Sequence, residues 1–452
     1  MVKDDIEHGE HERQGTVWTA TAHIVAALIG SGVLALAWSV AQLGWIVGPL
    51  VLLFFSGVTY YTSALLANCY RFPDPVSGTI NRAYIDAVRS YLGPRHVFLC
   101  GCAQYVNLWG TLVGYTITAS ASMMAVKRTG CFHRNGHGAR CEASGNMYMV
   151  VFGLFQLVLS QFPSLENITW LSVVAVATSF GYSFISLGLC IGKWASHGEL
   201  RGSLGGTSNV APSDKGFNVL LALGNIAFAY TFADVLIEIQ DTLKSPPAEN
   251  KSMKKATFNG IGLTTIFYLL LGCIGYAAFG NDSPGNILTG FGFYEPYWLV
   301  DMANICVIVH LIGAYQVYAQ PIFARFENFL LFYWPENKFL HKTYSIGSLS
   351  FTLSKLVLRT ILIMFTTLVA MLLPFFNAVL GLIGALGFWP LAVYFPLGMH
   401  MAQEKIKRGA PKWFMLQGLS FVCLLVSIAA SVGSVADIVH NLKAAAPFKT
   451  VY

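Results

Sequence analysis

Long apolar segments separated by short polar ones dominate the chain. A helix needs about 20 mostly apolar residues to cross a bilayer, and eleven segments of this kind are present. Runs such as VLLFFSGVTYY and IFYLLLGCIGYAAF do not alternate as the strands of a membrane barrel would. The pattern predicts an all-α polytopic membrane protein with spans near residues 17–40, 43–69, 96–126, 147–162, 168–192, 217–240, 256–279, 297–324, 352–373, 376–398 and 413–437.

The composition agrees with this class. Hydrophobic residues make up 55% of the 452 residues and charged residues 11%, whereas soluble domains carry about 25% charged residues. Soluble, fibrous, disordered and disulfide-scaffold proteins are therefore excluded. The sequence contains no H-E-x-x-H, Walker A or G-x-S-x-G motif. We expect a protein that is not an enzyme, has no cofactor and does not bind nucleic acid.

The distribution of Lys and Arg predicts the orientation. Basic residues favour the cytoplasmic side of a membrane, and most of them fall there if the N-terminus is cytoplasmic and the C-terminus extracellular. Residues 127–146 then form an extracellular loop with two cysteines, Cys131 and Cys141. Their spacing favours a disulfide in an oxidising compartment. A Cys2His2 zinc site that includes His133 and His137 and a pair of free thiols are the alternatives.

A glycine-rich motif interrupts the first span. Gly30, Ser31 and Gly32 lie at its middle, where two glycines weaken the helix and let a ligand approach the backbone. If the helix unwinds here, the amides of Gly30 to Val33 face the midplane and suit a carboxylate, and the carbonyls of Ala26 to Ile29 suit a cation or an ammonium group. The alternative is a packing seam of small residues.

The sixth span contains an acidic residue at its middle. Asp234 follows Thr231 there, and a carboxylate at mid-bilayer requires a cavity or a partner. If this span also breaks, near Ala229, Asp234 either caps the second half-helix or contacts a cationic ligand group. Glu238 and Asp241 follow, and we expect them in a cytoplasmic ion-pair network with candidate partners Lys244, Lys355 and Arg359.

Further polar residues lie inside other spans. His23 in the first span and His310 in the eighth can carry a proton, because the unperturbed pKa of histidine lies near neutrality. Packing or hydrogen bonding is the alternative role for each. In the third span, Asn107 either lines a cavity, together with Tyr105, or makes hydrogen bonds between helices.

Three blocks of sequence carry a resemblance to a known family. AHIVAALIGSGVLALAWSVAQLGWIVGP, LIEIQDTLKSPPAENKSMKKA and VIVHLIGAYQVYAQPIF occur in the order and spacing of the plant amino acid permeases, in the amino acid/auxin permease superfamily. The chain resembles this family over essentially all spans. The resemblance implies a LeuT-type fold with two inverted five-helix repeats and one extra helix. It also implies proton-coupled amino acid symport across the plasma membrane.

The resemblance also implies how the chain is divided into segments and where the substrate site lies. It implies a tail at 1–16, repeats at 17–192 and 217–398 joined by the loop 193–216, a loop at 399–412, a last span at 413–437 and a tail at 438–452. Such transporters bind substrate between broken helices in corresponding positions of the two halves. The spans that contain Ser31 and Asp234 correspond, and an acidic Asp234 would tilt selectivity toward Lys and Arg.

Other functions stay open at this point. A sodium-coupled symporter, an auxin carrier and a non-transporting amino acid sensor are compatible with the same fold. A membrane-embedded enzyme is disfavoured by the missing motifs. The expected partners are an amino acid, protons and the lipid bilayer, and the oligomeric state is undetermined.

Overall fold

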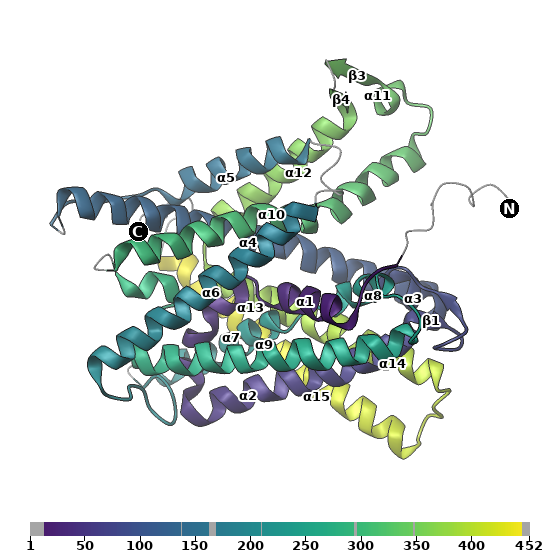
Figure 1. The fold of residues 1–452 in the computed structure, drawn as a ribbon, viewed down its shortest axis with the longest axis horizontal. Coiled ribbons are helices and arrows are strands. Elements are labelled where there is room, and N and C mark those ends of the chain that lie inside the picture. Colours follow the sequence, from purple (N-terminus) through teal and green to yellow (C-terminus); the bar gives the residue numbers. More distant parts are fainter. Residues whose placement is uncertain are drawn as a thin grey trace.

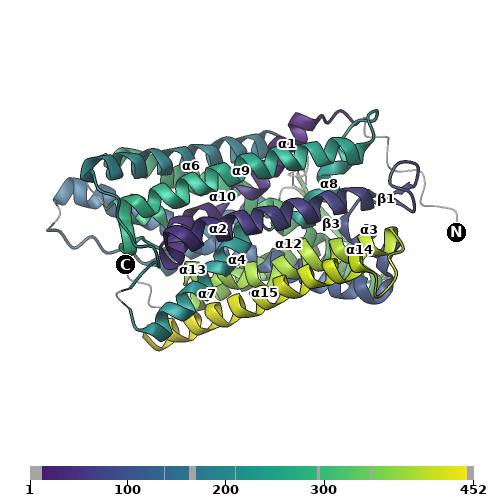
Figure 2. The ribbon, with the colours of Figure 1, turned by 90° about the horizontal axis from the view of Figure 1, so that it is seen from below.

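The computed structural model describes residues 13–136, 138–161, 169–208, 210–292, 296–346 and 349–444. Long helices run side by side and form one elongated bundle (Figures 1 and 2). The main helices are α1 (Val17–Leu28), α2 (Leu36–Leu66), α3 (Tyr84–Leu92), α4 (Pro94–Asn135), α5 (Gly145–Ser160), α6 (Thr169–His197), α7 (Pro212–Ala229), α8 (Leu236–Asp241), α9 (Glu249–Phe279), α10 (Tyr297–Tyr333), α11 (Lys338–His341), α12 (Leu353–Leu372), α13 (Phe376–Gly387), α14 (Phe395–Gln403) and α15 (Pro411–Ala444).

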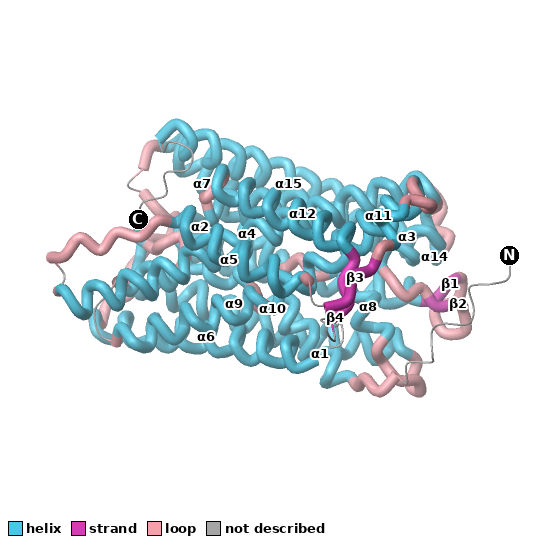
Figure 3. Tube along the Cα trace, turned by 90° about the horizontal axis from the view of Figure 1, so that it is seen from above, coloured by secondary structure: helices cyan, strands magenta, loops and turns pink. Residues whose placement is uncertain are grey.

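Short elements connect these helices. They are the 3-10 helices η1 (Ser31–Ala35), η2 (Ala67–Tyr70), η4 (Ala233–Val235), η5 (Gly280–Asp282) and η6 (Ile287–Phe291), and the π-helix η7 (Phe388–Tyr394). Two small antiparallel hairpins pair β1 (Arg71–Phe72) with β2 (Thr79–Ile80) and β3 (Thr343–Ile346) with β4 (Leu349–Thr352). Figure 3 shows how little of the described chain is strand.

The predicted fold class is confirmed. Among the described residues, nine helical stretches are long and apolar enough to cross a membrane, and α1 and α5 are shorter apolar helices. Each predicted span corresponds to a helix or to a broken helix, although α4 and α10 extend about two turns beyond the predicted ends. The stretch Ser31–Tyr70 combines the end of the first span with the second.

Gly44 separates the first two spans. Its φ of 83° lies in the left-handed region that favours glycine, and this interrupts α2. A Cβ atom at Gly44 would lie 2.3 Å from the carbonyl oxygen of Leu204. The loop before α7 therefore packs directly onto this bend, and the amide of Thr207 donates to the Ala41 carbonyl at 2.9 Å.

Both spans with interrupting motifs are broken as predicted. The first span ends its α-helix at Leu28 and resumes with η1 at Ser31. The sixth span ends its α-helix at Ala229 and resumes with η4 at Ala233. Two short breaks in corresponding spans thus divide α1 from η1 and α7 from η4.

The elements β1, α3 and α8 lie at one end of the bundle (Figures 1 to 3). Charged residues form ion pairs there. Asp241 pairs with Arg13 at 2.8 Å and accepts a hydrogen bond from the Tyr70 hydroxyl at 2.6 Å. Lys355 and Arg359 instead pair with Glu327. The predicted partners of Asp241 are therefore wrong, because Arg13 comes from the start of the chain and Lys355 and Arg359 lie on α12.

Glu238 also differs from its predicted role. Its carboxylate accepts the backbone amide of Tyr84 at 3.1 Å, at the start of α3. None of the ion pairs found among the described residues includes Glu238. This carboxylate therefore caps a neighbouring helix end, where the helix dipole favours negative charge.

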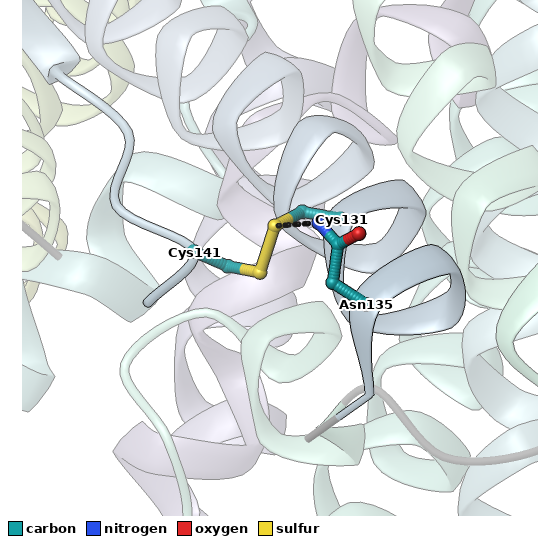
Figure 4. The surroundings of a disulfide bond; sticks show 3 residues. All are labelled: Cys131, Asn135 and Cys141. Carbon is teal, nitrogen blue, oxygen red and sulfur yellow. Dashed lines mark hydrogen bonds between the residues drawn. A yellow bond between two sulfur atoms is a disulfide. The ribbon is translucent and has the colours of Figure 1, made fainter. Parts of the chain in front are cut away.

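The two loop cysteines form a disulfide (Figure 4). Cys131 and Cys141 are bonded, with their Cα atoms 5.8 Å apart. Helix α4 continues to Asn135, so Cys131 lies on its last turns and not in a loop as the sequence suggested. Because both thiols are used, the alternative zinc site loses its sulfur ligands. His133 instead stacks on Tyr297, with ring centroids 4.3 Å apart.

Glycines let α7 and α13 approach each other very closely. A Cβ atom at Gly384 would lie 2.2 Å from the Gly224 carbonyl oxygen, and one at Gly224 would lie 2.4 Å from the Gly381 carbonyl oxygen. Backbone therefore packs on backbone along this seam, as small residues allow between membrane helices. The broken span formed by α7 and α8 lies deep in the bundle as a result.

Candidate functional site

A small cavity lies where the two helix breaks meet. Its wall comes from both sides of the first break, from the end of α7 and from α4 and α10. The lining residues are Ala27, Leu28, Gly30, Ser31, Gly32, Asn107, Thr111, Tyr115, Phe228, Ala229, Thr231 and Tyr318. Of the predicted binding residues, Gly30, Ser31, Gly32, Asn107, Ala229 and Thr231 are brought together in this wall.

The first break presents backbone donors to the cavity. Ser31 and Gly32 begin η1, and the first amides of a helix have no carbonyl partner within it. The amide of Gly30 bonds to the Leu28 carbonyl at 2.9 Å, and that of Val33 bonds to the Gly30 carbonyl at 3.3 Å. The predicted set of four amides is thus reduced to two, because the outer two are used in the turn itself.

The second break contributes a helix end of opposite polarity. Ala229 is the last residue of α7, so its carbonyl group belongs to the negative end of that half-helix. The Thr231 hydroxyl donates to the Ala227 carbonyl at 2.7 Å. Free amides from η1 and helix-end carbonyls from α1 and α7 therefore border the same small space.

Two side chains in the wall have unused polar atoms. Ser31 is 2% exposed, and its hydroxyl has no hydrogen-bond partner among the described residues. Asn107 is 4% exposed, and within the same part of the chain its Oδ1 has no partner either. Buried polar atoms are normally paired. Because Ser31 and Asn107 also line the cavity, their unpaired atoms are available to a polar ligand there.

Asp234 lies behind Asn107, outside the cavity wall. Its Oδ2 accepts from Asn107 Nδ2 at 3.1 Å. Neither η4 nor α8 has a side-chain cap, and their N-cap residues are Phe232 and Val235. The capping role is therefore wrong, because η4 already begins one residue before Asp234. No ion pair among the described residues involves this buried carboxylate.

Two other predicted residues are also outside the wall. Ile29 and Val33 flank the break and are 2% and 0% exposed, with neither among the lining residues. Their contribution is limited to the backbone geometry of the turn. Residues that the sequence did not single out take their place, because aromatic rings of Tyr115, Tyr318 and Phe228 enclose the cavity.

The aromatic rings come from three different helices. Tyr115 on α4 and Tyr318 on α10 meet edge to face, with ring centroids 5.6 Å apart. Phe228 is on the last turn of α7. No local pattern marks these rings, since tyrosine and phenylalanine are frequent throughout the spans. Only the packing of α4, α7 and α10 brings them to the site.

The two histidines have different surroundings. His310 is 6% exposed on α10, and its Nδ1 lies 2.8 Å from the Ala175 carbonyl oxygen on α6. Its ring also meets Tyr182 at a centroid distance of 5.8 Å. His23 lies on an exposed face of α1. Neither lines the cavity.

Comparison with known proteins identifies the family. Residues 13–440 match the family described as "Transmembrane amino acid transporter protein". The chain belongs to this family. Amino acid permease 6 of Arabidopsis thaliana is 53% identical, over 98% of this chain and 94% of its own length. Amino acid permease 3 of the same plant is 52% identical, over 99% and 95%. Lysine histidine transporter-like 6, also from that plant, is 30% identical, over 94% and 91%.

These relatives confirm the resemblance to the plant amino acid permeases. The family consists of membrane transporters, so the prediction that the chain is not an enzyme is confirmed as well. The permease fold is shared more widely. MhsT in complex with L-phenylalanine superposes with a TM-score of 0.50 at 11% identity, covering 91% of this chain and 98% of MhsT. A Na+-coupled sialic acid symporter superposes with a TM-score of 0.50 at 14% identity, covering 97% and 92%. Both neighbours support the LeuT-type fold.

Proposed function

We propose that this permease imports amino acids by proton-coupled symport across the plasma membrane, with the substrate bound in the cavity between the two helix breaks. The observation that carries the proposal is the convergence of both breaks on a space with unpaired polar atoms. The names of the relatives, amino acid permeases 6 and 3, agree with this substrate class.

The cavity is complementary to the part that all α-amino acids share. The amides of Ser31 and Gly32 form the positive end of η1 and suit the carboxylate. The carbonyl ends of α1 and α7 suit the ammonium group. The Ser31 hydroxyl adds a further donor. Recognition of the backbone leaves the substrate side chain to contact Asn107 and the aromatic rings.

Asp234 would extend the range of substrates to cationic amino acids. Its carboxylate reaches the cavity wall through the Asn107 amide. A Lys or Arg substrate that displaces this amide would gain a charge-assisted hydrogen bond. Neutral substrates would leave the Asn107–Asp234 pair intact.

Coupling to protons requires a group that titrates during the transport cycle. His23 and His310 are the candidates, since imidazole changes charge near neutral pH. His23 lies on the half-helix α1, which is separated from the rest of its span by the break. His310 links α10 to α6. We assign the coupling role to His23 and a supporting role to His310.

The proposed orientation places the N-terminus in the cytoplasm and the C-terminus outside. The Lys and Arg distribution supports this arrangement. The disulfide between Cys131 and Cys141 then lies on the extracellular side, where an oxidising environment maintains such bonds.

Electrophysiology in a heterologous cell tests the proposal. We expect a panel of neutral and basic amino acids to evoke inward currents. These currents should be larger at acidic external pH and unchanged when sodium is replaced. Competition by indole-3-acetic acid would instead indicate an auxin carrier. If the protein binds amino acids but shows neither substrate-evoked current nor uptake of labelled amino acid, it is a sensor.

A pair of serine variants localises the site. Ser31→Ala removes an unpaired hydroxyl from the cavity and should lower apparent affinity. Ser39→Ala removes a buried hydroxyl that bonds only to the Ala35 carbonyl of its own helical turn and should leave affinity unchanged. Equal effects of both changes would contradict the assignment of the cavity.

A further inference from the structure

A single phenol connects the two helix breaks. Tyr268 lies on α9 and is 0% exposed. Its hydroxyl donates to the carbonyl oxygen of Leu28, the last residue of α1. The same hydroxyl lies 3.1 Å from the carbonyl oxygen of Ala229, the last residue of α7. One side chain thus occupies the point at which both half-helices end.

The C-terminal ends of helices attract cations and hydrogen-bond donors. The last carbonyl groups of a helix have no amide partner within it and carry partial negative charge. In inverted-repeat transporters, half-helix C-terminal ends and unwound carbonyls coordinate the coupling cation. Two such ends converge here, and Leu28 and Ala229 also line the cavity. The junction therefore has the chemistry of a site for a monovalent cation.

The phenol is held at this junction by its neighbours. The ring of Tyr230 packs against that of Tyr268, with centroids 5.3 Å apart and planes at 73°. The Tyr230 hydroxyl donates to Thr265 Oγ1 at 3.1 Å, and Thr265 Oγ1 lies 2.7 Å from Ser56 Oγ. These contacts connect α9 to α2 and to the end of α7. These contacts hold the buried ring beside the two carbonyl groups, in the space that an ion would need.

We propose that the Tyr268 hydroxyl takes the place of a sodium ion between the two half-helices and thereby excludes sodium from this junction. The hydroxyl donates a hydrogen bond to the Leu28 carbonyl and remains close to the Ala229 carbonyl. Unlike a sodium ion, it adds no charge. Tyr268 is thus a positioning residue, because it holds the last carbonyl groups of two half-helices at Leu28 and Ala229, which both line the cavity. The inference rests on the proposed function only where substrate affinity is concerned.

Thermal unfolding of the purified full-length protein tests sodium exclusion without any transport. The melting temperature is measured in sodium chloride and in choline chloride of equal ionic strength. The native protein should unfold at the same temperature in both salts. Tyr268→Ser opens space beside the two carbonyl groups, so sodium should raise its melting temperature by about 3 °C or more. Stabilisation of the native protein by sodium, or no sodium effect on Tyr268→Ser, would overturn sodium exclusion.

A second pair of variants tests the positioning role. Tyr268→Phe keeps the ring and leaves buried carbonyl groups unpaired, which should weaken apparent substrate affinity about tenfold. Tyr230→Phe is the matched control, because it removes a buried hydroxyl that contacts Thr265 and no helix end. Wild-type affinity in Tyr268→Phe, or an equal loss in both variants, would overturn the positioning role. If the native protein takes up no amino acid, the proposed function fails, while the unfolding experiment still decides sodium exclusion.

Discussion

The glycines at the first helix break have different surroundings. A Cβ atom at Gly30 would meet only the Tyr115 hydroxyl, at 4.0 Å, whereas one at Gly32 would lie 3.0 Å from the Phe228 ring and 3.2 Å from the Ala229 Cα atom. Gly30 has an extended backbone that other residues adopt, with φ of −119°. Gly30 therefore borders open space in the cavity, and Gly32 permits contact between the two broken spans.

This contrast predicts different effects of two alanine substitutions. Gly30→Ala should reach the cell surface normally and weaken apparent substrate affinity about tenfold, because one methyl group enters the cavity. Gly32→Ala should lower stability by about 1–3 kcal/mol, because a crowded site must shift. Surface biotinylation, thermal unfolding and uptake distinguish them. Normal uptake by Gly30→Ala would show that substrate does not approach this backbone.

Asp234 gives a prediction about selectivity. Asp234→Asn keeps the size of the side chain and its contact with Asn107 but removes the charge. Uptake of Lys and Arg should fall about tenfold, the scale of a hydrogen bond to a charged group, and uptake of neutral amino acids should stay nearly unchanged. Competition between labelled neutral and basic amino acids measures the difference. An equal loss for every substrate would indicate a structural or coupling role.

At the level of elements, the glycine seam between α7 and α13 fixes the position of the broken sixth span. Gly384→Ala would place a methyl group against the Gly224 carbonyl and the Phe228 amide. The helices must then separate, so stability and uptake should both fall, by about 1–3 kcal/mol in stability. Gly262→Ala on α9 is the control, because a Cβ atom there meets nothing within 4 Å. A wild-type melting temperature in Gly384→Ala would contradict the seam.

The disulfide joins the end of α4 to the segment before α5. Membrane-impermeant maleimide applied to intact cells should label neither Cys131 nor Cys141 until a reductant is added. The bond blocks both thiols, and the proposed topology places them outside. A variant with both cysteines replaced by serine is the control for labelling elsewhere. Labelling before reduction would contradict the disulfide, and labelling only from the cytosol would reverse the topology.

At the level of the whole molecule, we expect α1 and α8 to move relative to α4, α6 and α10 during transport, because repeats rock against each other in transporters built from inverted repeats. Arg13 ties the start of the chain to Asp241 at the end of α8, and the Gly15 amide bonds to the Thr242 carbonyl at 2.9 Å. These contacts connect the start of α1 to the end of α8, whereas Tyr268 connects the other end of α1 to the end of α7. We expect α1 and α8 to move together.

Substitution of the two histidines tests which of them couples transport to protons. His23 lies on α1, whereas His310 lies between α10 and α6. His23→Asn should lose the steep dependence of substrate-evoked current on external pH between about 5 and 8, the range in which imidazole titrates. His310→Asn should mainly change apparent affinity. Unchanged pH dependence in His23→Asn would exclude it as the coupling residue and direct attention to His310 or Asp234.

The sequence by itself determined the membrane class and the spans, and it indicated where two helices would break if they did. These features are local, because each depends on about 20 consecutive apolar residues or on a short motif such as Gly30 to Gly32 that weakens a helix. The spacing of Cys131 and Cys141 also favoured the correct disulfide. Of the predicted site residues, the cavity is lined by Gly30, Ser31, Gly32, Ala229 and Thr231 at the breaks and by Asn107.

Only the tertiary structure decided what meets at those breaks. Tyr268 and Leu28 are 240 positions apart, and Asn107 and Asp234 are 127 apart. The sequence offered a capping role for Asp234 and predicted Lys244, Lys355 or Arg359 as partners of Asp241. These expectations failed because local patterns contain no information on which helices become neighbours. Burial then makes the outcome specific, since a polar group far from water requires a partner, and the packing of the bundle selects which residue supplies it.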